Sequence, residues 1–215
     1  MLENIPYLPY VISAFIGIGL AAATGFRVFL PMFAVSLASY MGWIPMNESF
    51  QWLSGLPTLI TTGIATIVEI LAYYIPFVDH LLDTMSIPLA TVAGSVMFAS
   101  QFAEIGTFPQ WALALIAGGG TAAAISSGFA GTRAASTATT GGLGNSVVAT
   151  TETAGAGIMS ILALAAPIIA FIVAIILIIA VVFFGRKIWR KFKNFNTDQP
   201  DKIIEVESIE TRHLE

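Results

Sequence analysis

Long apolar runs separated by short polar or proline-rich stretches make up most of this 215-residue chain. Runs close to 20 apolar residues are long enough to cross the hydrocarbon core of a bilayer as helices. A helix also satisfies its backbone hydrogen bonds within one segment, which lipid requires. We therefore predict an all-α integral membrane protein with about five hydrophobic segments, over residues 10–42, 58–75, 89–102, 109–125 and 158–184.

Two of these segments have lengths that do not suit a single upright crossing. The first is too long at about 1.5 Å per residue, and Pro31 with three nearby glycines predicts that it bends or breaks near Arg27. The third, residues 89–102, has the length of a re-entrant or buried helix as much as that of a crossing. It follows a short acidic helix predicted over 76–88, and the sequence leaves its topology open.

Three other stretches carry expectations of their own. Residues 43–57 contain two tryptophans and two prolines, which predicts an interfacial loop or a short surface helix. The fifth segment contains Pro167, and its length predicts one tilted span. Residues 126–157 consist mainly of Gly, Ala, Ser and Thr. That stretch is either non-helical backbone that lines a cavity, or tightly packed helix with a glycine-rich external loop.

Composition and charge agree with a membrane location. The chain is 56% hydrophobic and 10% charged, whereas soluble domains contain about 25% charged residues. The absence of cysteine excludes disulfides, thiol catalysis and thiolate metal sites. Five of the nine Lys and Arg residues lie between positions 186 and 193. This cluster predicts a cytoplasmic C-terminus and attraction to anionic lipid, and a disordered acidic tail is expected to complete residues 186–215.

Two stretches of the chain share a plan that suggests an internal repeat. Residues 19–27 (GLAAATGFR) and 120–133 (GTAAAISSGFAGTR) both open with Gly-x-Ala-Ala-Ala, pass a Gly-Phe pair and end on arginine. A glutamate and then a proline follow each arginine further along the chain. Small transporters are commonly built from repeats around a midplane site. We predict one transmembrane domain over residues 1–185, with halves at roughly 10–83 and 109–185, parallel or inverted.

The membrane region also holds a set of ionisable side chains: Arg27, Glu69, Asp79, His80, Asp83, Glu104, Arg133 and Glu152. A charge in hydrocarbon costs at least a few kcal/mol, so these groups are expected to pair with one another or to face water. An ion pair between Arg27 and Glu69 is one such expectation. The carboxylates outnumber the arginines, which favours protonated carboxyls, a bound cation or contact with water.

Asp79 and Asp83 are four residues apart and share one face of a helix, with His80 beside them. Two carboxylates and an imidazole can bind a divalent metal, relay protons or couple to a substrate. The alternative interpretation is that the carboxylates cap a short helix and pair with one of the arginines. In the stretch 126–157, Asn145 and the hydroxyl side chains can solvate an ion or a polar solute.

Three blocks of the sequence together resemble the DUF4126 family of bacterial and plastid membrane proteins: GIGLAAATGFRVFLPMF, VEILAYYIPFVDHLLDTMSIPLATVAG and GTRAASTATTGG. The resemblance covers roughly residues 13–185, and the pattern Glu-x6-Pro-x2-Asp-His-x2-Asp is its most specific part. Tyr73 and Tyr74 stand where the resemblance implies an acidic–basic pair, so a charge relay through these positions is not expected. The family name denotes unknown function, so the resemblance supports the membrane class and implies no substrate.

These observations favour a small secondary transporter or channel for an ion or a small polar or anionic solute. Its candidate site residues are Arg27, Glu69, Asp79, His80, Asp83, Arg133, Asn145 and Glu152, with Asp79 and Asp83 also the candidate metal ligands. A non-catalytic membrane scaffold that self-associates through small-residue faces is the alternative, and a metal-dependent enzyme acting on lipid phosphates is less favoured. We expect a bacterial inner-membrane location and contacts with lipid and solute but not with nucleic acid. The sequence leaves any cofactor open.

Overall fold

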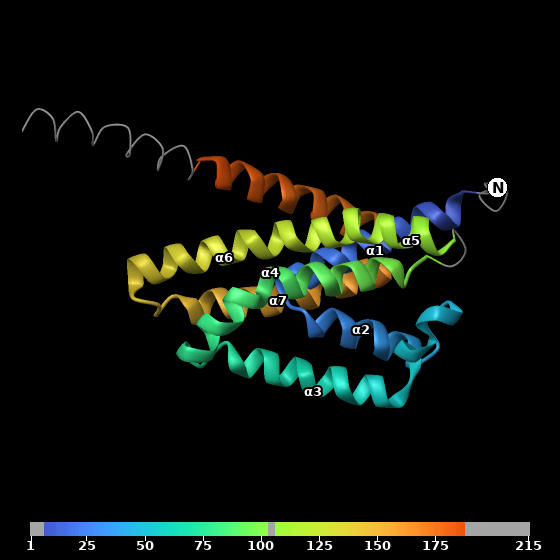
Figure 1. Cartoon of the computed structure of the whole chain (residues 1–215), viewed down its shortest axis with the longest axis horizontal. Coiled ribbons are helices and arrows are strands. Elements are labelled where there is room, and N and C mark those ends of the chain that lie inside the picture. The colour runs from blue at the N-terminus through green and yellow to red at the C-terminus, as the bar shows by residue number, and fades with distance from the viewer. Residues whose placement is uncertain (1–6, 103–105, 188–215) are drawn as a thin grey trace, which may run out of the picture.

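The computed structural model describes residues 7–102 and 106–187, without the side chains of Pro76, Phe77 and His80. Every regular element in these two ranges is helical, and five helices are long and apolar enough to cross a membrane. The predicted all-α membrane class is therefore confirmed. In chain order the elements are α1 (Leu8–Phe26), α2 (Phe29–Tyr40), η1 (Glu48–Ser54), α3 (Leu56–Ala72), α4 (Pro76–Ala99), α5 (Thr107–Leu113), η2 (Ala114–Gly119), α6 (Gly120–Thr140), α7 (Asn145–Ala165) and a last helix over Pro167–Lys187 (Figure 1).

The first apolar segment consists of two helices that meet at Arg27. Helix α1 ends at Phe26, the backbone of Arg27 is extended (φ −145°, ψ 136°), and α2 begins at Phe29. In Figure 1, α2 runs back toward the end of the bundle at which α1 begins. The junction thus lies among the other helices, where Arg27 is only 1% exposed.

The helix boundaries at two prolines differ from those predicted. Helix α4 continues through Pro88, so the predicted division into residues 76–88 and 89–102 is wrong. A proline inside a helix removes one backbone hydrogen bond, and here packing against α1 and η2 supports the helix beyond it. Pro167, by contrast, separates α7 from the last helix, so the predicted single span 158–184 is also wrong. Ala166 adopts a non-helical conformation (φ −143°, ψ 69°), as expected of a residue before proline.

The small-residue stretch 126–157 is helical on both sides of a short turn. Its first part belongs to α6 and its second to α7, so extended non-helical backbone is not found there. The turn needs glycine because Gly141 and Gly142 have φ values of 63° and 92°. Serine and threonine hydroxyls in these helices donate to carbonyls four residues back, as Thr132 does to Gly128. These bonds satisfy the hydroxyls inside the helix itself.

The two similar sequence stretches lie side by side. Phe26 and Phe129, which belong to the two Gly-Phe pairs, have ring centroids 4.9 Å apart. A Cβ atom on Gly25 would lie 2.7 Å from the Cβ of Ile125, so α1 and α6 approach closely at this point. The repeat and its halves stay a prediction, but its two motifs are neighbours across one helix contact.

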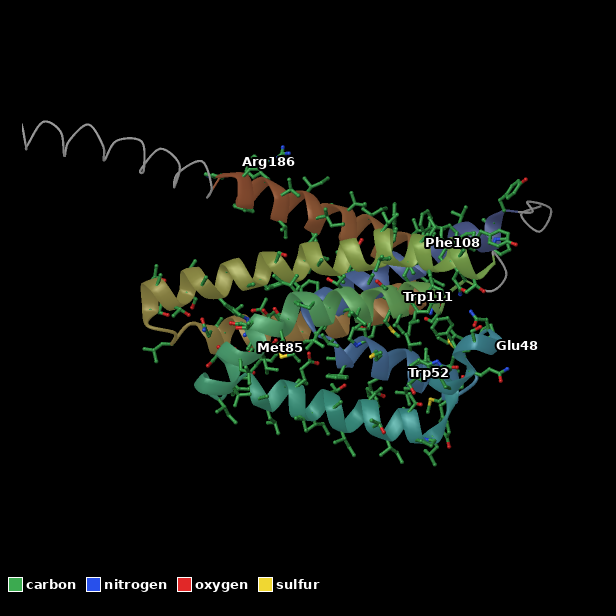
Figure 2. All side chains as sticks on the ribbon, viewed as in Figure 1. Glu48, Trp52, Met85, Phe108, Trp111 and Arg186 are labelled. Atoms are coloured by element: carbon green, nitrogen blue, oxygen red, sulfur yellow. The ribbon has the colours of Figure 1, made fainter. Side chains whose placement is uncertain are left out.

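The outer surface of the bundle is apolar along the helices and carries aromatic residues at one end. Helix α3 exposes Ile60, Ile64, Ile67, Val68 and Leu71. Trp52, Phe108 and Trp111 lie at the end at which α1 begins, and Arg186 lies toward the other end (Figure 2). Helix η1 lies within residues 43–57, where a loop or a short surface helix is predicted. It meets α3 at an angle of 62°.

Candidate functional site

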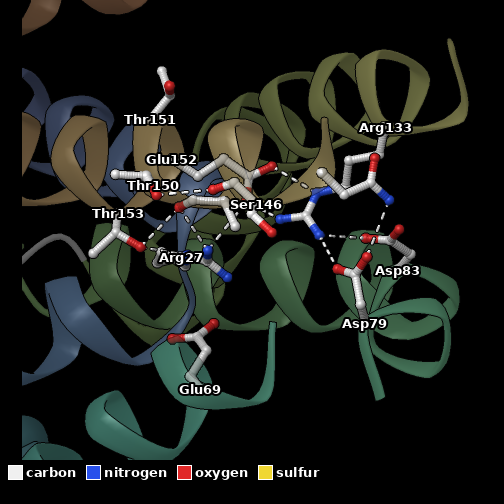
Figure 3. Close-up of polar contacts among 12 residues, drawn as sticks. Arg27, Glu69, Asp79, Asp83, Arg133, Ser146, Thr150, Thr151, Glu152 and Thr153 are labelled. Carbon is white, nitrogen blue, oxygen red and sulfur yellow. Dashed lines mark hydrogen bonds and ion pairs between the residues drawn. The ribbon is translucent and has the colours of Figure 1, made fainter. Parts of the chain in front are cut away.

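Arg133 on α6 is the centre of a buried ion-pair cluster. Its Nε donates to Glu152 Oε1 at 2.9 Å, and its Nη2 binds the other oxygen of the same carboxylate. Its Nη1 binds Asp79 and lies 3.2 Å from Asp83 Oδ1. Figure 3 shows the guanidinium held between Glu152 on one side and the two aspartates on the other. Such paired contacts are the strong arrangement of arginine with carboxylates, and here they join α4, α6 and α7.

Arg27 binds the same face of α7. Its Nη2 donates to the carbonyl of Ala149 at 2.8 Å and lies 3.5 Å from Glu152 Oε2. Its Nε lies 3.2 Å from the Thr153 hydroxyl oxygen. Glu152 contacts both arginines and is therefore their shared carboxylate. It is only 2% exposed. The cluster thus extends from α6 across α7 to the junction of α1 and α2.

Tyr73 connects the two arginines on a further side. The guanidinium carbon of Arg27 lies 3.8 Å from the centroid of the Tyr73 ring, and that of Arg133 lies 4.1 Å from it. Contacts this close between a cation and an aromatic face are attractive. Sequence reasoning missed this residue, because Tyr73 was considered only as a departure from a charged pair. The available signal was its position four residues after Glu69, one helical turn further along and directly after the last residue of α3.

Glu69 does not form the predicted ion pair with Arg27. Its two carboxylate oxygens instead accept hydrogen bonds from the backbone N–H groups of Val28, at 2.8 Å, and Phe29, at 3.0 Å. These are the first amide groups of α2, which have no partners within their own helix. The positive end of the helix dipole also favours a carboxylate at this position. Glu69 therefore caps α2 from α3.

Asn145 extends the cluster toward the surface. Its Nδ2 donates to Asp79 Oδ2 at 3.1 Å and to the Thr137 hydroxyl at 3.2 Å. It also lines a pocket of about 200 Å³ beside the turn between α6 and α7. The pocket is lined by Tyr73, Tyr74, Asp79, Gly141, Gly142, Leu143, Asn145 and Ser146. A small pocket of mixed polar and apolar lining therefore reaches Asp79, at the edge of the buried charges.

The predicted metal ligands have a different observed role. Asp79 and Asp83 both contact Arg133. In the part of the chain that the structure describes, no three His, Asp or Glu side chains are arranged to hold a metal ion. The side chain of His80 and all of Glu104 lie outside the described residues. The proposed metal site stays a prediction, while the alternative pairing of the aspartates with an arginine is observed.

Two atoms of the cluster are buried without a hydrogen-bond partner among the described residues. They are Nη1 of Arg27, a donor, and Oδ1 of Asn145, an acceptor. Two arginines and four carboxylates (Glu69, Asp79, Asp83 and Glu152) give a formal charge of 2 − 4 = −2. The excess negative charge is partly compensated at Glu69, because this carboxylate lies on the positive N-terminus of a helix. At Asp83 it is partly screened by solvent, because that side chain is 23% exposed.

A comparison with protein families finds one whose sequence pattern matches residues 14–187, described as Domain of unknown function (DUF4126). Neither a search of curated proteins nor one of solved structures finds a significant match to the chain. The match spans α1 to the end of the last helix, and every member of the buried cluster lies within it.

Proposed function

The chain belongs to the DUF4126 family, and we propose that it is a small secondary transporter or channel for an ion or a small polar or anionic solute. Ionisable groups inside a membrane bundle are costly and commonly mark a path for substrate or protons. Here six of the eight candidate site residues are joined by contacts between their side chains, and Glu69 lies on the two amide groups that follow Arg27. His80, whose side chain is not described, is the exception.

The observation that carries this proposal is the pair of buried atoms without partners, Arg27 Nη1 and Asn145 Oδ1. Buried polar groups in folded proteins are almost always hydrogen-bonded, so an orphaned group needs an explanation. In a purely structural cluster, an unpaired donor and an unpaired acceptor would only cost stability, because each loses its hydrogen bonds to water. A region that solvates a passing solute needs both.

Tyr73 is well placed to control access to this region. It lines the pocket beside the α6–α7 turn, and its ring contacts the guanidinium groups of Arg27 and Arg133. The polar side chains of Asp79, Asn145 and Ser146 line the same pocket. Movement of the Tyr73 ring would then open the way to the arginines. We propose that this ring is the barrier within the pathway.

Flux measurements on the purified chain in liposomes test the transport function. Wild-type protein is expected to move at least one ion from a panel of chloride, nitrate, formate, sodium and potassium. Arg27→Lys keeps the charge but cannot make all three Arg27 contacts, and flux should fall by about tenfold or more, equivalent to about 1.4 kcal/mol. Arg186→Lys, at an exposed position, is the matched control and should retain flux. Equal flux in both variants would contradict the proposal.

Removal of the Tyr73 ring should increase passive leak. Tyr73→Ala takes away the side chain between pocket and guanidinium groups, so downhill flux is expected to rise by about tenfold, with loss of the attractive ring contacts. Tyr40→Ala, which removes an exposed ring at the end of α2, is the control. The measurement is the initial rate of solute efflux from proteoliposomes. A leak that is unchanged in Tyr73→Ala would rule out the barrier role.

We also propose an orientation and partners for the chain. The basic segment that starts at Arg186 and Lys187 favours a cytoplasmic C-terminus by the positive-inside rule. The family resemblance favours a bacterial inner membrane. Anionic lipid is the partner that suits the basic segment, and the exposed small residues of α6 suit association with a second copy.

A further inference from the structure

The Glu69 carboxylate occupies a position that suits a free anion. It lies on the first two amide groups of α2, where a helix N-terminus offers unpaired N–H donors and a positive dipole end. The carboxylate belongs to another helix, α3, and only its two oxygens make these contacts. The cap of α2 is thus supplied by a carboxylate that is tethered to another helix and could be replaced by a free anion.

The unpartnered nitrogen of Arg27 supplies a second and independent observation. Arg27 directly precedes the two amide groups, it is 1% exposed, and its Nη1 has no acceptor among the described residues. In Figure 3 the end of its guanidinium without a dashed line points toward the side on which Glu69 lies. A buried guanidinium donor normally has an acceptor. A free anion is not attached to α3 as the Glu69 carboxylate is, so it can take a position that contacts all three donors.

We propose, building on the transport function above, that the α2 N-terminus and Arg27 Nη1 form a binding site for a small monovalent anion, which Glu69 fills when no anion is bound. The site has hydrogen-bond donors, and both Arg27 and Glu69 are buried, which favours a small ligand over a large one. Formate, chloride and nitrate are anions of the right size and charge. This assignment names the substrate class that the transport proposal left open.

Exchange at this site couples the anion to a proton. Two negative groups cannot share the same two amide donors, so Glu69 has to leave as the neutral acid when an anion enters. Each anion that binds therefore enters with one proton from the aqueous phase: an O–H bond of a hydronium ion breaks, an O–H bond forms on a Glu69 oxygen, and no other covalent bond changes. The charged and titratable groups that face Glu69 are Arg27, Glu152 on α7 and Tyr73, directly after α3. Both arginines already engage Glu152, which leaves Glu69 to take the proton.

Chemical rescue tests the site directly. In the full chain, Glu69→Ala removes the tethered carboxylate and should lower Tm, and sodium formate should restore it by roughly 3 °C or more at saturation because ligand binds only the folded state. Sodium gluconate at equal ionic strength should have no such effect. Wild-type protein at neutral pH should not respond to formate, since Glu69 fills the site. Glu48→Ala, at an exposed glutamate, is the matched control.

A second variant covers the case in which Glu69→Ala does not fold. Glu69→Gln keeps the side-chain volume and one acceptor oxygen but cannot release or take up a proton. Its response to formate should be the same at acidic and neutral pH, whereas the wild-type response should appear only as the pH falls. A pH-dependent response in Glu69→Gln, or equal responses of wild type and Glu69→Ala at neutral pH, would overturn the site.

Flux data separate this inference from the function on which it rests. Formate rescue of Glu69→Ala without solute flux by wild type would establish the anion site and remove the transport proposal. Flux by wild type without any rescue, in Glu69→Ala or Glu69→Gln, would keep transport and remove the anion site. The Tm response and the flux are measured on the same purified protein, so a failure of one can be assigned to the anion site or to transport.

Discussion

Glu152→Gln is expected to lower the free energy of unfolding by about 3–5 kcal/mol, because it leaves two buried arginines without their shared carboxylate. Glu152 makes two contacts with Arg133 and one with Arg27. Glutamine has the same shape, but its amide group would present N–H donors to a guanidinium that is itself a donor. The measurement is thermal or denaturant unfolding of the purified chain in detergent, with a large fall in Tm as the expected result.

The other carboxylates of the cluster provide graded controls for this prediction. Asp83→Asn should cost less, because the Asp83 side chain is 23% exposed, while those of Asp79 and Glu152 are 5% and 3% exposed. Glu48→Gln, on the surface of η1, should have almost no effect. If Glu152→Gln and Glu48→Gln unfolded at the same temperature, the cluster would not hold the helices together.

The class of fold follows from the sequence, but the helix boundaries at proline do not. Apolar runs and the scarcity of charge were sufficient to predict membrane helices. Pro88 and Pro167 both lie inside apolar stretches, yet α4 continues through the first and the chain breaks at the second. The difference arises from packing between distant helices, since α4 lies against both α1 and η2. The residues around each proline do not indicate such contacts between distant helices.

The membership of the candidate site was predictable, whereas its pairing was not. A charge in an apolar segment must find a partner, and this argument alone selected Arg27, Glu69 and Arg133. Which partner each finds depends on the register between helices. Glu69 binds the amide groups of α2 instead of the Arg27 side chain, and a backbone partner has no sequence signal. Tyr73 was missed because it entered the sequence analysis only as a departure from the charged pair that the family resemblance implies.

Close contact between α4 and the η2–α6 helix is the condition that brings the aspartates to Arg133. A Cβ atom on Gly94 would lie 2.5 Å from the Cβ of Ala122 and 3.0 Å from the carbonyl oxygen of Gly118. Glycine is required here because any side chain would meet atoms of the other helix. Helix α4 carries Asp79 and Asp83, and α6 carries Arg133. The spacing of the ion pairs thus depends on a contact between small residues.

Gly94→Leu should therefore separate the two helices and disrupt both folding and the cluster. Extra methylene groups in a packed core cost about 1–3 kcal/mol and occasionally more, and leucine here meets backbone as well as a side chain, so a value of about 3 kcal/mol is expected. Gly120→Leu is the matched control, because a Cβ atom on Gly120 has nothing within 4 Å. Unfolding temperature and liposome flux should fall together in Gly94→Leu and stay near wild type in Gly120→Leu. Equal behaviour of the two variants would mean that α4 and α6 are further apart, and that Arg133 finds its carboxylates by another arrangement.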